Sequence, residues 1–136
     1  MIRLRQVDER IKYISSFYKS IKLWGYLMKK LNIYDIGGDI VKEDERYVVR
    51  DNKALKNLIL SSTDLKPNKS TTGHKHKGQE EVYYFLKGFG EMQLDNEKVD
   101  VFAGDVILIE DGVSHKVKAG KDGLYFICIF NGKRNH

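Results

Sequence analysis

The chain has 136 residues, enough for one domain with a buried core, and a net charge of +5 at neutral pH. Its single cysteine, Cys128, excludes an intramolecular disulfide framework, and its apolar runs are far too short to cross a bilayer. One thiol and no secretory signal predict a cytoplasmic protein that does not associate with membranes.

The positive charge is confined to the start of the chain. Residues 1–31 carry eight basic and two acidic side chains, a balance of +6, which leaves −1 for the rest of the sequence. The basic character therefore does not describe the remainder of the chain, and we expect no nucleic-acid partner.

Residues 1–36 are predicted to form an N-terminal amphipathic α-helical extension. Apolar side chains recur at helical spacing from Ile11 to Leu31, polar residues fill the other face, and Gly37-Gly38 is a stop signal. A basic amphipathic helix can bind a membrane or an acidic partner, but an apolar stripe on a surface helix usually packs on its own domain or on a second subunit. We expect the latter, with residues 37–136 forming a separate β-barrel domain.

From residue 39 the pattern changes to short runs of β-branched and aromatic residues, separated by Gly, Asp and Asn. These runs predict strands at 46–50, 55–61, 81–86, 91–94, 98–102, 106–109, 113–117 and 124–130. Asp95-Asn96 is a hairpin turn candidate, and 66–69 is a loop. Many short strands at close spacing indicate an all-β barrel or sandwich.

Three of the four histidines are spaced so that they can meet a carboxylate. His74 and His76 are separated by one residue, Glu81 follows them closely, and His115 lies further along the chain. Because residues i and i+2 of a strand point to the same face, His74 and His76 can both point inward. Neutral imidazoles with one carboxylate suit Fe, Mn, Ni, Co, Cu or Zn, so the sequence predicts a metal site.

This spacing resembles the two sequence motifs of the cupin superfamily, over roughly residues 55–130. The first motif has two histidines, a glutamate and, after six intervening residues, a glycine, which here are His74, His76, Glu81 and Gly88. The second motif is matched by Gly104, Gly112 and His115. The chain departs from the family pattern at positions that are not metal ligands in the family, namely Asn68, Glu110 and Ala119.

The resemblance implies a small single-domain cupin with the double-stranded β-helix fold, also called a jelly roll or cupin barrel. It implies one divalent transition metal (Mn, Fe, Ni or Zn) with the ligands His74, His76, Glu81 and His115. The six-residue gap to Gly88 selects Glu81 rather than Glu80 as the carboxylate ligand. An octahedral ion with four protein ligands keeps two positions for water or substrate, as a catalytic site requires.

A narrower resemblance is to the archaeal cupin-type glucose-6-phosphate isomerases, in the stretch Thr71 to His76 and in Glu81-Val82-Tyr83-Tyr84. It implies that Thr71 and Gly73 help to bind a phosphate and that Tyr83 lines a sugar pocket. The isomerase reaction moves a proton between C1 and C2, and a metal at both oxygens would stabilise the enediolate. Glu81 would then be the catalytic carboxylate that shuttles this proton.

Two other functions remain open on the sequence alone. One is a non-catalytic cupin module that binds a sugar or another small ligand, and the other is an Fe- or Ni-dependent dioxygenase. Fold alone does not choose among them. In each case we expect a small-molecule ligand, and we expect a homodimer because an open sheet edge and an apolar helix both require cover.

Overall fold

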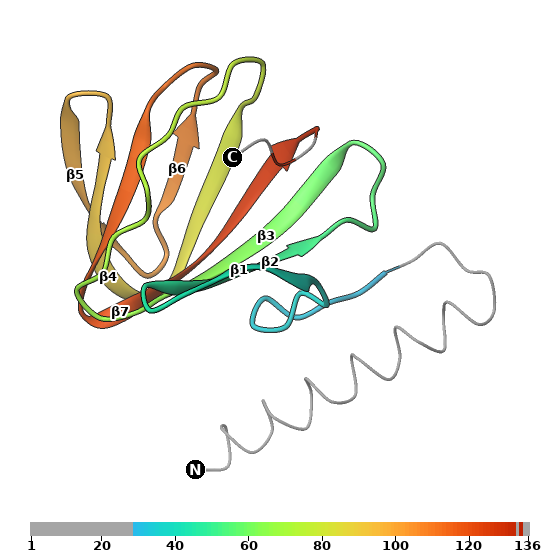
Figure 1. Cartoon of the computed structure of the whole chain (residues 1–136), viewed down its shortest axis with the longest axis horizontal. Helices are drawn as coiled ribbons and strands as arrows, with labels where there is room; N and C mark the ends of the chain where they lie inside the picture. Colours follow the sequence, from blue (N-terminus) through green and yellow to red (C-terminus); the bar gives the residue numbers. More distant parts are fainter. Residues whose placement is uncertain (1–28, 133, 135–136) are drawn as a thin grey trace, which may run out of the picture. The chain divides into compact units, whose positions relative to one another are not determined.

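The computed structural model describes residues 29–132 and residue 134 (Figure 1). This part of the chain is all-β and contains seven strands. They are β1 (Asp39–Glu43), β2 (Tyr47–Asn52), β3 (Leu58–Leu65), β4 (Glu81–Leu94), β5 (Glu97–Phe102), β6 (Val106–Ile109) and β7 (His115–Asn131).

The strands form a single antiparallel sheet with the order β1-β2-β3-β7-β4-β5, and β6 pairs with β4. Two long strands, β4 and β7, run through both halves of the sheet. Glu81, at the start of β4, lies opposite Phe130 of β7 and Ile109 of β6, whereas Leu94, at its end, lies opposite His115. The sheet curls between β1 on one side and β5 on the other (Figure 1).

The curl requires a break in β4 near Gly88. The pairing of β4 with β7 shifts register on both sides of this residue, and Gly88 has a φ of 89°, a conformation that favours glycine. A Cβ atom at this position would overlap the carbonyl oxygen of Gly123 on β7. Gly88, the glycine of the first motif, is therefore the residue that allows the two long strands to approach and bend.

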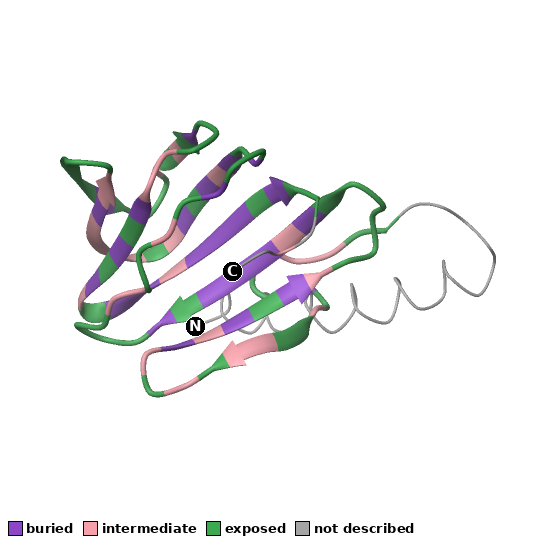
Figure 2. Ribbon diagram, turned by 45° about the horizontal axis from the view of Figure 1, so that its top comes forward, coloured by how far each residue is buried: buried purple, intermediate pink, exposed green. Residues whose placement is uncertain are grey.

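The hydrophobic core lies on the concave face of the sheet. Buried and exposed residues alternate along the strands (Figure 2), as in β2, where Tyr47, Val49 and Asp51 are buried and Arg50 is exposed. In β4, Glu81 and Phe85 are buried on the inner face. The largest fully buried side chains of the sheet are Phe85, Phe126, Leu65, Met92 and Leu124.

The predicted strands are largely confirmed, with three corrections. Residues 81–86 and 91–94 were predicted as two strands but belong to the single strand β4. Likewise, most of 113–117 and all of 124–130 fall in the single strand β7, which begins at His115. Glycines read as breaks lie inside these strands, where bulges absorb them without ending the pairing. Strand β1 was not predicted, and β2 extends to Asn52.

Most of the predicted helical extension (1–36) lies outside the described residues. Its last part, residues 29–36, is described and is not helical, because Asn32 and Asp35 pair in an isolated bridge. The side chain of Asn32 accepts a hydrogen bond from Tyr34 N, and that of Asp35 accepts one from Gly37 N. Such local side-chain bonds compete with helix formation. No helix in the described part of the chain is long and apolar enough to cross a membrane.

Candidate metal centre

The segment that carries His74 and His76 runs alongside the start of β7. His74 and His115 exchange two backbone hydrogen bonds, of 3.2 and 2.9 Å, and Thr71 N donates to Val117 O at 2.9 Å. Gly112 N in turn donates to His76 O. No regular strand forms here, only isolated bridges, but these hydrogen bonds still direct the histidines of both motifs to one place.

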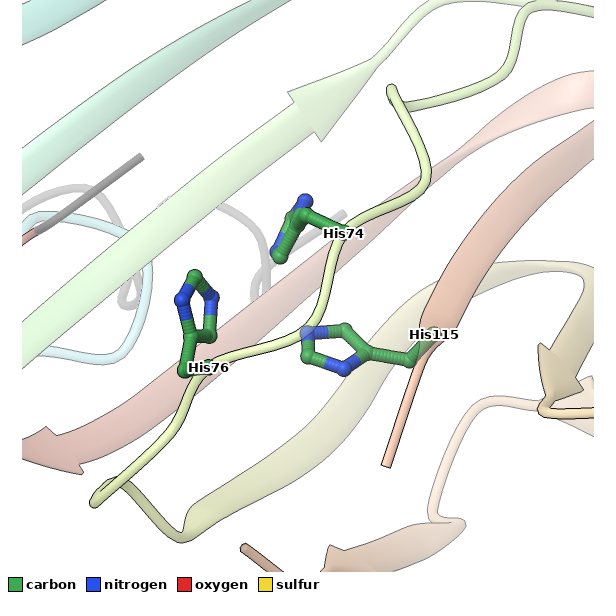
Figure 3. A group of neighbouring side chains, drawn as sticks. All are labelled: His74, His76 and His115. Atoms are coloured by element: carbon green, nitrogen blue, oxygen red, sulfur yellow. The ribbon is translucent and has the colours of Figure 1, made fainter. Parts of the chain in front are cut away.

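The three histidines form a compact cluster (Figure 3). One ring nitrogen from each of His74, His76 and His115 lies within 4.8 Å of the others. Glu81 joins them from the first residue of β4, with Oε2 at 3.1 Å from His115 Nε2 and Oε1 at 3.6 Å from His76 Nε2. His76, Glu81 and His115 are each at most 5% exposed. The structure thus brings together all four residues predicted to be metal ligands.

Two of the rings are oriented by backbone carbonyl groups. His74 Nδ1 lies 2.8 Å from Thr72 O, and His115 Nδ1 lies 3.1 Å from Val113 O. A carbonyl oxygen only accepts hydrogen bonds, so Nδ1 carries the proton in each ring. In a neutral ring Nε2 then presents its lone pair to the cluster, which is the arrangement that carbonyl-oriented histidine ligands adopt around metals.

The electrostatics favour the ligand form of these groups. Burial, together with the neighbouring His115, lowers the pKa of His74 to about 4, so its ring is neutral at pH 7. Burial acts to raise the pKa of Glu81, but a hydrogen bond from His115 and the electrostatic influence of the neighbouring imidazoles outweigh it and lower the pKa. The cluster therefore presents a neutral His74 ring and an ionised Glu81 carboxylate at pH 7.

This donor set fits a divalent transition metal. Three imidazole nitrogens and a carboxylate oxygen are ligands that Mn, Fe, Ni and Zn accept, and a buried carboxylate at the centre needs a compensating cation. With four protein ligands, such an ion retains open positions for water or an oxygen-bearing ligand.

Two residues of the cluster, His74 and Glu81, border a cavity of about 50 Å³ inside the barrel. Tyr83 borders this cavity and packs against Phe126, with ring centroids 5.3 Å apart and planes 21° apart. Its hydroxyl is hydrogen-bonded to the thiol of Cys128, and burial raises the pKa values of both groups well above their ordinary range. Tyr83 thus forms a neutral and largely apolar part of the cavity wall, and its role in binding a sugar stays a prediction.

The two residues predicted to bind phosphate lie in different settings. Thr71 borders the cavity, but its hydroxyl accepts a hydrogen bond from Val117 N at 3.0 Å and lies 3.5 Å from Val117 O. Gly73 is exposed and does not border the cavity, and a Cβ there would meet only Lys116, at 3.7 Å.

Sequence reasoning missed the charged wall of the cavity. Arg134 donates two hydrogen bonds of 2.7 Å to Asp51 and one of 2.8 Å to Ser61, and its guanidinium lies over the ring of Phe130. Lys42 borders the same cavity from β1. The signal for Asp51 is present in the sequence, since a carboxylate occupies the inward position that follows Tyr47 and Val49 in β2. No comparable signal marks Arg134.

A family model described as a cupin domain matches residues 62–130, about half of the chain. Two curated proteins are similar in sequence at 33% identity. One, from Methanocaldococcus jannaschii, is described only as uncharacterized protein MJ1618, and the match covers 60% of this chain and 75% of that protein. The other is an oxalate-binding protein of Thermotoga maritima, where the match covers 52% of this chain and 60% of that protein.

Solved structures show the same fold at low sequence identity. KdgF from Halomonas sp. superposes with a TM-score of 0.64 at 18% identity, covering 71% of this chain and 88% of that one. A predicted oxalate decarboxylase from Thermotoga maritima gives 0.59 at 24% identity, covering 74% and 96%. A variant of the Bacillus subtilis oxalate decarboxylase OxdC gives 0.65 at 21% identity, covering 74% of this chain and 29% of that one.

Proposed function

Because this chain belongs to the cupin domain family, we propose that it holds one divalent transition metal and binds a small anionic ligand at the metal's open positions. His74, His76, Glu81 and His115 would be the ligands of a Mn, Fe, Ni or Zn ion, which would polarise the oxygen atoms of the bound molecule. The observation that carries the proposal is the convergence of three imidazoles and a carboxylate in one cluster, of which His74 and Glu81 border a cavity.

The surroundings of the cavity support an anionic ligand. Lys42 and Arg134 border it, and Arg46 borders the outer groove that shares His74 with it. A relative at 33% identity is described as oxalate-binding, which is the same chemical class of ligand. The inner cavity of about 50 Å³ has room for roughly three to five water molecules, so it suits a ligand of few atoms.

Calorimetric titration of oxalate into the metal-loaded and the chelator-treated protein tests the proposal. Binding should occur in the loaded protein and be lost without metal, because the metal supplies the principal contact. The His76→Ala variant provides the matched protein without a complete site. Equal binding of oxalate by the loaded protein, the chelated protein and this variant would refute a metal-dependent ligand site.

A more specific proposal is aldose–ketose isomerisation of a sugar phosphate, with Glu81 as both metal ligand and proton shuttle. Its lowered pKa supports this, because a base must be ionised to accept a proton. Thr71, Gly73 and Tyr83 are the proposed substrate-binding residues. Exchange of solvent deuterium into glucose 6-phosphate at C2 is the test, and His76→Ala should abolish it. No exchange in the metal-loaded protein would leave ligand binding without isomerisation.

We also propose a homodimer that forms through the outer face of the sheet. Val106 and Leu108 of β6, Tyr84 of β4 and Ile129 of β7 are 39–72% exposed, and the strand pairing places them beside one another. A continuous apolar sheet surface of this kind usually marks an interface. Light scattering should give twice the chain mass, and a monomer at micromolar concentration would contradict the proposal. The reducing cytoplasm remains the proposed location, in keeping with the buried free thiol of Cys128.

A further inference from the structure

A β-bulge turns Lys42 toward the interior of the barrel. In the ladder between β1 and β2, Ile40 pairs with Arg50 but Lys42 pairs with Val49, so one extra residue lies between these two pairs. Directly paired residues share a face of the sheet, and Val49 is a buried core residue on the inner face. Without the bulge Lys42 would lie opposite Val48 and point outward, so the bulge is what directs the ammonium group inward.

Lys42 occupies the junction of two spaces. It borders the inner cavity of about 50 Å³, together with His74 and Glu81. It also borders an outer groove of about 470 Å³, which Arg46 and Thr72 line as well. A molecule bound at the histidine cluster therefore has Lys42 beside it on the way to solvent.

The other two cations near Lys42 are already neutralised. Arg134 is held by Asp51 through two hydrogen bonds of 2.7 Å, and Arg46 is held by Asp44, also at 2.7 Å. Lys42 itself has no carboxylate within ion-pair distance among the described residues. It is half-buried, and burial together with the charges of Arg134 and Arg46 lowers its pKa. Glu81 borders the inner cavity and Glu43 the outer groove, but neither lies within ion-pair distance of Lys42. Among the described cations that border the two spaces, Lys42 is therefore the one that no carboxylate holds in an ion pair.

We propose that Lys42 binds a second anionic group of the ligand, whose first oxygen-bearing group lies at the histidine cluster. The inference rests on the proposed metal site and specifies its ligand class as a small dianion. A compact dicarboxylate would lie mostly within the inner cavity, whereas a sugar phosphate would extend its phosphate past Lys42 toward the outer groove. Both supply the same chemistry, an anionic oxygen for the Lys42 ammonium.

The test compares ligands that differ only in the second anionic group. Acetate is paired with malonate, and glucose with glucose 6-phosphate, in calorimetric titrations of the metal-loaded full chain. The variants are Lys42→Met, which keeps the aliphatic stem, Lys42→Arg, which keeps the charge, and Lys56→Gln. Lys56 is exposed in the connection between β2 and β3 and borders neither space, so it controls for loss of a charge.

The wild type should bind the dianion of at least one pair more tightly than its partner. Lys42→Met should reduce that affinity roughly ten- to a hundredfold, as expected for loss of a charged hydrogen bond, and leave acetate or glucose binding within about twofold. Lys42→Arg should retain most of the preference, and Lys56→Gln all of it. The pair that shows the effect identifies the source of the second anionic group.

Metal content separates this inference from the proposed function. One equivalent of metal in the wild type and in Lys42→Met shows that the centre is intact in both. If the loaded wild type has no preference within either pair, or if Lys42→Met keeps the preference, the Lys42 inference is overturned while the metal centre stands. If the wild type takes up no metal, the proposed function fails and the inference fails with it.

Discussion

Removing Arg134 should destabilise the barrel although this residue lies two positions from the end of the chain. The side chain of Asp51 is 0% exposed and that of Arg134 is 15% exposed, and they meet in a bidentate contact at 2.7 Å. An Arg134→Met variant keeps much of the apolar stem but leaves a buried carboxylate with Ser61 as its neighbour. Breaking a buried pair in this way costs about 3–5 kcal/mol, and the lower end applies because Arg134 lies beside the cavity.

Urea denaturation is the appropriate assay for this prediction. The free energy of unfolding falls with urea concentration by about 2 kcal/mol/M, so a loss of about 3 kcal/mol in this free energy lowers the urea midpoint by roughly 1.5 M. The double variant Asp51→Leu/Arg134→Met removes both charges and should recover most of the loss, because the cost comes from the unpaired carboxylate. A midpoint for Arg134→Met within about 0.3 M of the wild type would refute the reasoning, as would a double variant less stable than the single one.

Three further perturbations test other parts of the structure. The lowered pKa of His74, about 4, means that the fold disfavours the ring's proton, so the metal-free protein should lose stability as pH falls from about 6.5 to 4. The loss of unfolding free energy should be roughly 1–2 kcal/mol after allowance for partial exposure of the ring. In His74→Gln the urea midpoint should depend less steeply on pH, and a pH dependence equal to that of the wild type would contradict this. Gly88→Ala should lower the free energy of unfolding by at least about 2 kcal/mol, because the added Cβ would overlap Gly123 and the backbone φ at this position is 89°. A thermal midpoint equal to that of the wild type would contradict the role given to Gly88 in the bend of β4. Leu108→Asp should halve the mass measured by light scattering, and a persisting dimer would exclude the outer face as its interface.

The strands and the histidine cluster were predictable because their signals are local or have a fixed spacing. Residues 106–109 form a strand with the predicted bounds, and the buried alternation of Glu81, Tyr83 and Phe85 follows from the two-residue period of a strand. The histidines of the two motifs lie together because the start of β7 has a neighbour on each side. Leu94 of β4 pairs with His115 in the ladder between β4 and β7, and His74, in the segment before β4, pairs with His115 in an isolated bridge.

The charged wall of the cavity was not predictable, because it depends on register and on distant pairing. Lys42 faces inward only through a bulge, which is a property of two paired strands and not of either sequence alone. Arg134 meets Asp51 across 83 positions of the chain. The length of β4 was missed for a related reason. In the sequence Gly88 follows a run of β-branched and aromatic residues and indicates its end, but in the fold pairing with β7 continues past it.

The most direct test of the metal centre is elemental analysis of the purified, untagged protein beside its His74→Ala/His76→Ala double variant. We predict about one equivalent of Mn, Fe, Ni or Zn in the wild type and none in the variant, since three imidazoles and Glu81 form the site. Absence of metal from the wild type after reconstitution, or equal metal in both proteins, would contradict the central claim.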